Sequence, residues 1–265
     1  MSKAILVVSF GTSYPETRKR TIDAIEGDIA ASFGGYKLYR AWTSKMIMAK
    51  LLKRDGIKIN NVSEAMLLMV KDGITDVIIQ PTHVINGIEN DLMKEDALMH
   101  KGLFNSITFG NPLLTTEDDN EHIAGIIAES FSYLDPEKEA LVLMGHGTSH
   151  YANAVYGALN FRFRDIGRPN IFLGTVESYP TLEALIRAVK ETGAKKVYLA
   201  PFMVVAGDHA NNDMAGDDEN SWQVRFSEAG FEVECIIKGL GEYPQVRKMF
   251  VEHVKRAEQP AINNC

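Results

Sequence analysis

The chain has 265 residues, of which 45% are hydrophobic and 24% are charged, and its formal net charge is −7. This length suits two modest domains or one large one, and the composition is ordinary for a soluble globular protein. The acidic balance argues against nucleic acid as a partner, because binding phosphates requires a basic face.

No stretch approaches the ~20 apolar residues of a membrane helix, so no membrane contact is expected. Met1-Ser-Lys3 leads almost directly into a short apolar run, without the longer apolar region and cleavage site of a signal peptide. Cys235 and Cys265 provide neither a disulfide framework nor a metal-binding spacing. The expected location is therefore the cytoplasm.

Short β-rich runs alternate with longer helical patterns, which is typical of βαβ units in a parallel sheet. The strands expected in the first half are Ala4–Ser9, Lys37–Trp42, Asp76–Gln80 and Ser106–Phe109. The helices expected there are Pro15–Phe33, Ser44–Arg54, Ser63–Lys71, Ile88–His100 and Glu117–Leu134. Pro15 suits a first helical turn, and Ser63 suits an N-cap.

The second half shows the same alternation. Its expected strands are Ala140–Met144, Asn170–Val176, Lys196–Ala200 and Glu232–Ile237. Its expected helices are Tyr151–Arg164, Thr181–Thr192, Asp213–Ala229 and Tyr243–Glu258. Left-handed helix caps are expected at Gly73, Gly102, Gly193 and Gly230. The last residues, from Gln259 to Cys265, are expected to form a loose tail.

The second half also repeats the first in sequence. Ala4–Ser13 matches Ala140–Ser149 with a shift of 136, and Thr75–Glu89 matches Lys195–His209 with a shift of 120. A shorter match relates Ala41-Trp-Thr-Ser44 to Thr175-Val-Glu-Ser178, with a shift of 134. We therefore expect two similar Rossmann-like α/β halves, each a four-stranded parallel sheet flanked by helices, with a cleft between them. A boundary near Asp135-Pro-Glu137 gives domains 1–135 and 136–265, the second carrying the metal ligands.

Three strand ends of the second half carry side chains that are different in the first half. His146 replaces Phe10, Glu177 replaces Thr43, and His209 replaces Glu89. Ligands of open α/β sheets bind beyond the carboxyl ends of the strands, so these groups are expected to converge on one site if the halves face each other.

Two imidazoles and a carboxylate suit Co²⁺, Ni²⁺, Fe²⁺ or Zn²⁺. Three protein ligands leave coordination positions open, as a catalytic or transfer site requires. Each residue alone also has a bland interpretation, because a histidine after a strand is commonly a hydrogen-bonded loop residue. Glu177 alone could be a carboxylate at a helix N-terminus. The shared position of all three at strand ends favours the metal site.

Two strand-to-helix turns of small polar residues are candidates for binding an anionic substrate, since they present backbone N–H groups and hydroxyls. Their residues are Phe10, Gly11, Thr12 and Ser13 in the first half and Gly147, Thr148 and Ser149 after His146. His83 is a further candidate to line the cleft. The turns lack the spacing of dinucleotide or P-loop motifs, so no nucleotide cofactor is expected. The acidic run that contains Asp213 is interpreted as a solvated helix start rather than a second metal site.

Several motifs resemble the anaerobic sirohydrochlorin cobaltochelatases of the CbiK type, within the class II chelatase superfamily. They are Ser9-Phe-Gly-Thr-Ser13, Met144-Gly-His-Gly-Thr-Ser149, Val176-Glu-Ser-Tyr-Pro180, Ala206-Gly-Asp-His-Ala-Asn-Asn-Asp-Met214, Asp217-Asp-Glu-Asn-Ser-Trp222 and Gly239-Leu-Gly-Glu-Tyr-Pro244. The resemblance runs from Met1 to about Val254. It implies two α/β halves around a cleft, and insertion of Co²⁺ into sirohydrochlorin or precorrin-2 on the oxygen-independent route to cobalamin.

The resemblance also implies roles for single residues. It places the metal ligands at His146, Glu177 and His209 and a further acidic cleft residue at Glu89. The inner N–H protons of the tetrapyrrole must leave before the metal enters, and His146 is our expected proton acceptor, with Glu89 as the group that shares this work.

Because the substrate carries many carboxylates and the chain is acidic, some basic groups must face the cleft. The candidates are Arg40, Lys45 and Arg54. Aromatic contact with the ring is expected from Phe10, Tyr14 or Trp42, although core packing explains Trp42 equally well. Insertion of Fe²⁺ to give sirohaem, and a non-catalytic cytosolic carrier of metal or tetrapyrrole, are the alternatives. The sequence leaves open whether Co²⁺, Fe²⁺ or Ni²⁺ is the physiological metal and whether the chain forms a homo-oligomer.

Overall fold

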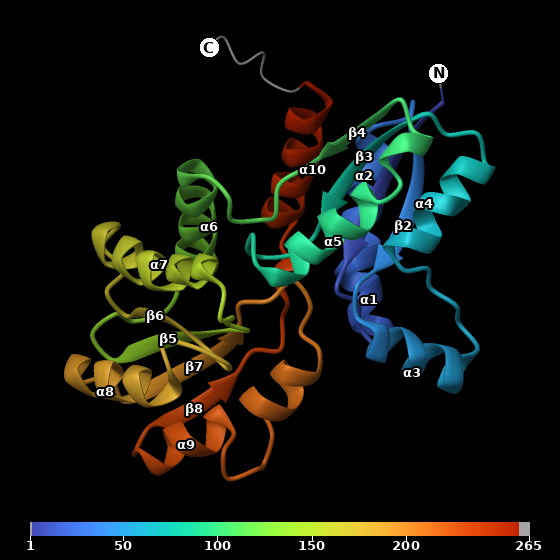
Figure 1. Cartoon of the computed structure of the whole chain (residues 1–265). Coiled ribbons are helices and arrows are strands. Elements are labelled where there is room, and N and C mark those ends of the chain that lie inside the picture. Colours follow the sequence, from blue (N-terminus) through green and yellow to red (C-terminus); the bar gives the residue numbers. More distant parts are fainter. Residues whose placement is uncertain (1, 260–265) are drawn as a thin grey trace. The chain divides into compact units, whose positions relative to one another are not determined.

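The computed structural model describes residues 2–259. Within that range the strands form two four-stranded sheets, ordered β2-β1-β3-β4 and β6-β5-β7-β8, in which all pairings are parallel (Figure 1). The first sheet consists of β1 Lys3–Ser9, β2 Lys37–Trp42, β3 Asp76–Pro81 and β4 Ser106–Phe109. The second consists of β5 Glu139–Gly145, β6 Ile171–Thr175, β7 Lys196–Pro201 and β8 Glu232–Cys235. The predicted fold class, two similar parallel α/β halves, is confirmed.

The helices follow the strands in the order expected for βαβ units. With the first sheet go α1 Pro15–Arg20, α2 Ile22–Ser32, α3 Lys45–Asp55, α4 Val62–Lys71, α5 Ile88–Leu98, η1 Lys101–Leu103 and α10 Pro244–Glu258. With the second go α6 Glu117–Ser130, η2 Tyr151–Asn153, α7 Ala154–Asp165, α8 Leu182–Thr192, η3 Ala210–Met214, α9 Trp222–Glu228 and η4 Leu240–Glu242. None of the helices between residues 2 and 259 is both long and apolar enough to cross a membrane.

The strands agree with prediction to within a residue or two, whereas some helices differ. The helix predicted over Pro15–Phe33 is broken at Thr21, whose hydroxyl donates to the Thr17 carbonyl at 2.6 Å. The helix predicted over Asp213–Ala229 is instead the π-helical turn η3 followed, after a gap, by α9. A Cβ at Gly216 would lie 2.3 Å from the carbonyl oxygen of Asn212, so only glycine fits this close approach of backbone.

Two predicted caps were also wrong. Helix α4 begins one residue earlier than expected and is capped by Asn61 rather than Ser63, in a capping box with Glu64. Gly102 lies within η1 and lacks a positive φ, although the other three glycines do have the predicted left-handed backbone. Of the predicted loose tail, all but Gln259 lies outside the described residues.

Two compact units divide the chain differently from the predicted boundary near Asp135. Of the described residues, the first comprises 2–115 and 243–259, and the second comprises 116–242. Helix α6 therefore belongs with the second sheet, and α10 returns to the first. Packing explains this return: Val246, Phe250 and Val254 of α10 are fully buried, and the Arg247 guanidinium pairs with Asp28 of α2 at 2.6 Å.

Each unit has its own hydrophobic core on its sheet. In the first unit, apolar side chains of β1, β2 and β3 pack with those of α4 and α5. In the second, the equivalent strands β5, β6 and β7 pack with α8, α9 and the η3 turn. Strands β1 and β5 are buried along almost their whole length, as expected for central strands of parallel sheets covered on both faces. The rigid strands carry the loops at their carboxyl ends, where polar side chains gather.

Candidate metal-binding site

Two of the predicted ligands come from neighbouring strand ends of the second unit. His146 follows β5, and Glu177 lies in the loop after β6, so the pairing of these strands brings them together. The His146 Nδ1 atom is 3.7 Å from Glu177 Oε2, and the two side chains are 44% and 56% exposed. This is ion-pair distance rather than a hydrogen bond, so Glu177 keeps both carboxylate oxygens free for another partner.

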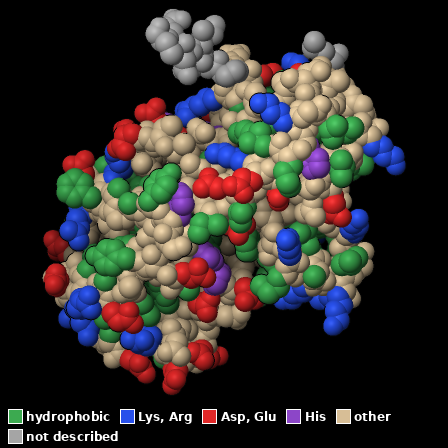
Figure 2. Space-filling model, in the orientation of Figure 1, with side chains coloured by type: hydrophobic (Ala, Val, Ile, Leu, Met, Phe, Trp, Pro, Cys, Tyr) green, Lys and Arg blue, Asp and Glu red, His purple; other side chains and the backbone are tan. Residues whose placement is uncertain are grey.

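The third predicted ligand, His209, joins this pair from the start of the helical turn that follows β7. Its imidazole ring lies 4.9 Å from that of His146, centroid to centroid, with the ring planes at 82°. The next residue, Ala210, is fully buried and belongs to the hydrophobic core, which anchors the backbone that carries His209. Figure 2 shows exposed histidine side chains beside acidic ones on the face drawn. The structure therefore brings the two predicted histidine ligands into contact.

Hydrogen bonds define which nitrogen of each ring is available. His146 Nδ1 lies 2.9 Å from the carbonyl oxygen of Gly147, and His209 Nδ1 lies 2.5 Å from Asp213 Oδ2. Since a carbonyl or carboxylate oxygen accepts hydrogen bonds, each Nδ1 of the neutral rings carries the proton. Each Nε2 then has the lone pair that a metal ion requires, and the Asp213 carboxylate orients the His209 ring.

Asp213 is a functional candidate that the sequence interpretation missed. Its carboxylate holds the His209 ring, which a residue in a solvated helix start would not do. The signal was present in the spacing, because residues four apart on a helical turn face each other. The π-helical turn that begins at Ala210 then makes this contact.

The three predicted ligands do not form a closed cluster. Over residues 2–259, no group of three His, Cys, Asp or Glu side chains has the spacing that would hold a metal ion. His146 lies next to both of the other residues, but Glu177 approaches only the Nδ1 atom of the His146 ring. Glu177 lies in the irregular loop 176–181, and its side chain is mostly exposed, so packing does not fix its rotamer.

Strand register corrects one of the predicted equivalences. Ser9 lies opposite Trp42, and its counterpart Gly145 lies opposite Thr175, so β2 and β6 are related by a shift of 133 rather than 134. The Glu177 N–H donates to the His146 carbonyl as the Ser44 N–H donates to that of Phe10. Glu177 therefore replaces Ser44, not Thr43. The four-residue sequence match was too short to determine the register.

The equivalence of Glu89 with His209 agrees with the structure. The carbonyl of Gly87 accepts from the Asp91 N–H, and that of Gly207 accepts from the Asn211 N–H, so both residues follow a helix-starting glycine by two positions. Glu89 is exposed in the first turn of α5. Its role in the reaction stays a prediction.

The two Gly-Thr-Ser turns have the same internal structure. Gly11 and Gly147 have φ values of 105° and 86°, which favour glycine. Thr12 Oγ1 accepts from the Tyr14 N–H at 3.2 Å, and Thr148 Oγ1 accepts from the His150 N–H at 3.1 Å. In both bonds the threonine hydroxyl is the acceptor, and the donating N–H belongs to the residue that follows the predicted anion-binding turn, Tyr14 or His150. Phe10, by contrast, is 45% exposed and open to contact with an apolar ring.

His83, the predicted cleft residue after β3, has a buried ring. Neither of its nitrogens has a hydrogen-bond partner that meets normal geometry. Burial lowers the pKa of His83 to about 4, while the side chain of Asn90 acts in the opposite direction. The imidazole is therefore neutral at physiological pH, which suits an internal packing role or a neutral donor.

This pKa leads to a prediction about acid stability. Because the pKa of His83 is lower in the folded chain than in the unfolded one, the unfolded state binds more protons between about pH 6.5 and pH 4. We expect the free energy of unfolding to fall by about 3 kcal/mol across this window on account of His83 alone. In His83→Asn, urea titrations at several pH values should show a smaller decrease in the free energy of unfolding as the pH falls. His122→Asn, on the exposed surface of α6, should show the same decrease as wild type. A wild-type decrease in His83→Asn would contradict the assignment.

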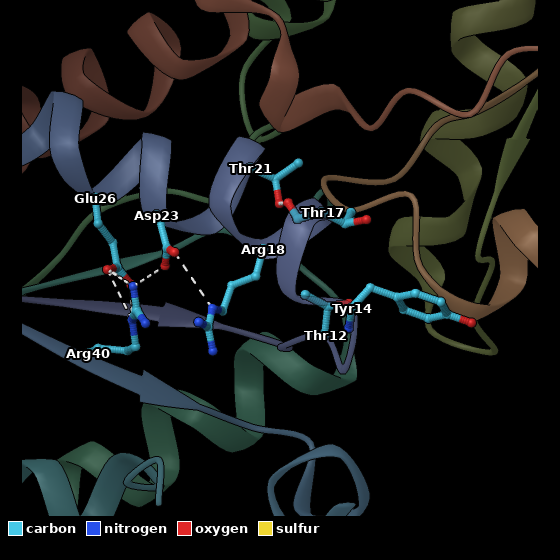
Figure 3. Close-up of polar contacts among 8 residues, drawn as sticks. All are labelled: Thr12, Tyr14, Thr17, Arg18, Thr21, Asp23, Glu26 and Arg40. Carbon is cyan, nitrogen blue, oxygen red and sulfur yellow. Dashed lines mark hydrogen bonds and ion pairs between the residues drawn. The ribbon is translucent and has the colours of Figure 1, made fainter. Parts of the chain in front are cut away.

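The basic candidates near the first sheet differ in availability. Arg40 donates to the carboxylates of Glu26 and Asp23, and Arg18 lies 3.6 Å from Asp23, as Figure 3 shows. Burial raises the pKa of Glu26, and the Arg40 guanidinium opposes that change. Arg40 is thus occupied in a partly buried ion network and is not a donor for substrate. Trp42 is fully buried, which confirms its core role.

Solved structures with this architecture define its class. SirB from Bacillus subtilis with Fe³⁺ has a TM-score of 0.65 at 12% sequence identity, with 97% of this chain and 96% of that chain covered. DR2241 from Deinococcus radiodurans, a multi-domain protein with structural similarity to chelatases, has a TM-score of 0.62 at 13% identity, with 96% of this chain and 55% of that chain covered. The fold is therefore the α/β fold of chelatases.

Sequence comparison then identifies the family. The Cobalt chelatase (CbiK) family model matches residues 3–259. The sirohydrochlorin cobaltochelatase of Salmonella typhimurium is 42% identical over 265 residues, which cover 100% of both chains. The sirohydrochlorin cobaltochelatase CbiKC of Nitratidesulfovibrio vulgaris is 31% identical over 257 residues, covering 96% of this chain and 90% of the relative. The chain belongs to the cobalt chelatase (CbiK) family, as its motifs predict, and is an enzyme of the chelatase class.

Proposed function

We propose that this chain inserts Co²⁺ into sirohydrochlorin, or into its reduced precursor precorrin-2, in anaerobic cobalamin biosynthesis. The family and the names of both relatives support the reaction. The observation that carries the site assignment is the contact between His146 and His209, each with its Nδ1 bonded to an oxygen and its Nε2 available. A cytoplasmic location is part of the proposal and is supported by the sparse cysteine usage.

In this proposal, His146, His209 and Glu177 bind the incoming Co²⁺. Three protein ligands leave open positions, which tetrapyrrole nitrogens can occupy one after another. The site must release the ion as well as bind it, and three partly exposed ligands suit that task better than a closed four-ligand cage. Fe²⁺ and Ni²⁺ are compatible with the same nitrogen and oxygen ligands and are the alternative metals. No nucleotide cofactor is needed.

Proton removal is the second part of the reaction. The inner N–H protons of the tetrapyrrole must leave before the metal enters its plane. His146 Nδ1 is hydrogen-bonded to Gly147, so its Nε2 would serve both the metal and the proton, at different times. His146 thus accepts a proton after the metal has left it. Glu89, an exposed carboxylate of the first unit, shares the proton transfer.

Anaerobic turnover tests this function directly. Purified protein is mixed with sirohydrochlorin and with Co²⁺, Fe²⁺ or Ni²⁺ in separate cuvettes, and the tetrapyrrole absorption is followed against enzyme-free controls. We expect many tetrapyrroles converted per protein chain, fastest with Co²⁺. Faster conversion with Fe²⁺ would favour the sirohaem reaction instead. A spectral change that stops at one tetrapyrrole per chain would identify a carrier and overturn the proposal.

A further inference from the structure

The first unit has an insertion that its repeat lacks. Residues 43–61 connect β2 to α4, whereas only 176–181 connect the equivalent β6 to α8. The flanking elements correspond closely, since Asn61 caps α4 as Thr181 caps α8. The extra chain contains helix α3 and lies after the carboxyl end of β2, the edge at which parallel sheets bind ligands. The second unit has Glu177 at this place, and the first has a helix.

Helix α3 packs only lightly on the unit. Leu51 is the one buried side chain of its eleven described residues. Most helices in proteins are stabilised by packing an apolar face, so a helix with so little buried surface needs another reason to be kept. Its own ends provide local stability, with Ser44 as the N-cap and Gly56 in a left-handed conformation as the C-cap.

The exposed face of α3 combines basic and apolar groups. Met46 is 77% exposed and shares one side of the helix with Lys50 and Lys53, which are also exposed. The segment 43–61 has five basic residues and one acid, in a chain whose net charge is −7. Figure 2 shows Lys and Arg side chains next to hydrophobic ones in the region of α3, at the lower right. Such a face fits an apolar ring that carries carboxylates.

Both ends of α3 are tied to the Phe10–Ser13 turn. The Ser44 N–H donates to the Phe10 carbonyl at 3.2 Å, and Arg54 Nη2 donates to the Ser13 carbonyl at 2.7 Å. Figure 1 shows α3 beside α1, the helix that follows this turn. Arg54 also pairs with Asp55, lowering the pKa of that carboxyl, with a further contribution from Arg18. Arg54 therefore positions the helix, while Lys50 and Lys53 have no partner of this kind among the described contacts.

We propose that α3 binds the carboxylate side chains of the tetrapyrrole, with Lys50 and Lys53 as the charged contacts and Met46 against the ring. This rests on the proposed function for the identity of the ligand. The carboxyl ends of the two sheets then carry opposite charges. The first unit has a basic helix for the carboxylates of the substrate, and the second has histidine and acidic side chains for the metal. The acidic chain thereby acquires a local attraction for an anionic substrate.

The test compares two charge-reversal pairs of the same unit. Lys50→Glu/Lys53→Glu is expected to weaken binding of metal-free sirohydrochlorin about tenfold and to raise KM for it similarly, with kcat and Co²⁺ binding unchanged. The salt dependence of KM should also decrease. Lys71→Glu/Lys101→Glu makes the same charge change at the amino-end edge of the first sheet and should leave binding within about twofold of wild type. Circular dichroism and the milder Lys50→Gln/Lys53→Gln pair control for folding.

Separate readouts distinguish this proposal from the function on which it rests. Wild-type turnover combined with unaltered tetrapyrrole binding by the α3 pair would overturn the role of α3 and leave the chelatase reaction intact. Equal weakening by both pairs would also overturn it, because the effect would then be one of net charge. A change of oligomeric state in the α3 pair would identify this face as an interface between copies. If wild type binds sirohydrochlorin without turnover, the binding comparison still tests α3.

Discussion

His209→Ala is expected to lose metal insertion while keeping the fold. The side chain is 36% exposed at the start of a helical turn, so its removal leaves no large cavity in the core. It removes one of two adjacent imidazole donors, and we expect Co²⁺ affinity and the insertion rate to fall by roughly 100-fold or more. Isothermal titration with Co²⁺ and the anaerobic turnover assay measure the two quantities.

A graded series sharpens this prediction. Asp213→Asn keeps the size of the side chain but removes the charge that holds the His209 ring, so a smaller loss of about tenfold is expected. His122→Ala removes an exposed histidine from α6 and should behave as wild type. Wild-type turnover by His209→Ala would refute the ligand assignment. An unchanged Co²⁺ affinity in Asp213→Asn would show that Asp213 has no influence on the metal.

Gly147→Ala is expected to have the largest effect on stability, and to damage the site as well. Gly147 has a φ of 86°, and an added Cβ would lie 2.8 Å from Thr175 Cβ and 3.0 Å from the Ser178 nitrogen. Thr175 is buried and bonds to the Ser178 N–H, so it has little room to move. Backbone strain and overlap together should cost about 3 kcal/mol and lower the melting temperature by roughly 10 °C.

The same substitution at Gly157 is the matched control. Gly157 lies in α7 with an open environment, since a Cβ there would meet nothing within 4 Å. Gly157→Ala should therefore stabilise the protein by about 0.5–1 kcal/mol through its helix propensity. Insertion should fall in Gly147→Ala because the turn positions both His146 and the Glu177 loop. If the two variants melted at the same temperature, the account of the turn would be wrong.

Much of the fold followed from the sequence because the signals were local. The short apolar runs predicted the strands, and the repeated Gly-Thr-Ser turns predicted equivalent strand-to-helix connections. The helix break at Thr21 was missed because its cause is a single side-chain bond to the Thr17 carbonyl. The non-helical segment before α9 was not predicted, because its residues are compatible with a helix. The feature that breaks the helix is the close approach of Gly216 to the Asn212 carbonyl, which is a contact of the folded chain.

The site was predicted in part for the same reason. His146, Glu177 and His209 were identified because a strand end is a local pattern, and the repeat showed where they differ from the first copy. The register of Glu177 was wrong by one residue, because hydrogen bonds between strands determine it. Asp213 accepts a hydrogen bond from His209 because a π-helical turn places it there. Arg40 is unavailable to substrate because it pairs with acidic side chains of a different element, α2.

The sequence by itself determined the α/β class, the internal duplication, the family motifs and the residue types offered to a metal. These depend on periodicity and spacing along the chain, which are properties of neighbouring residues. Only the tertiary structure decided that α10 completes the first unit and α6 the second, that Glu177 is the counterpart of Ser44, and that α3 is an exposed basic insertion. Those features arise from contacts between residues far apart in the chain, whose free energies depend on burial and hydrogen-bond geometry in the folded protein.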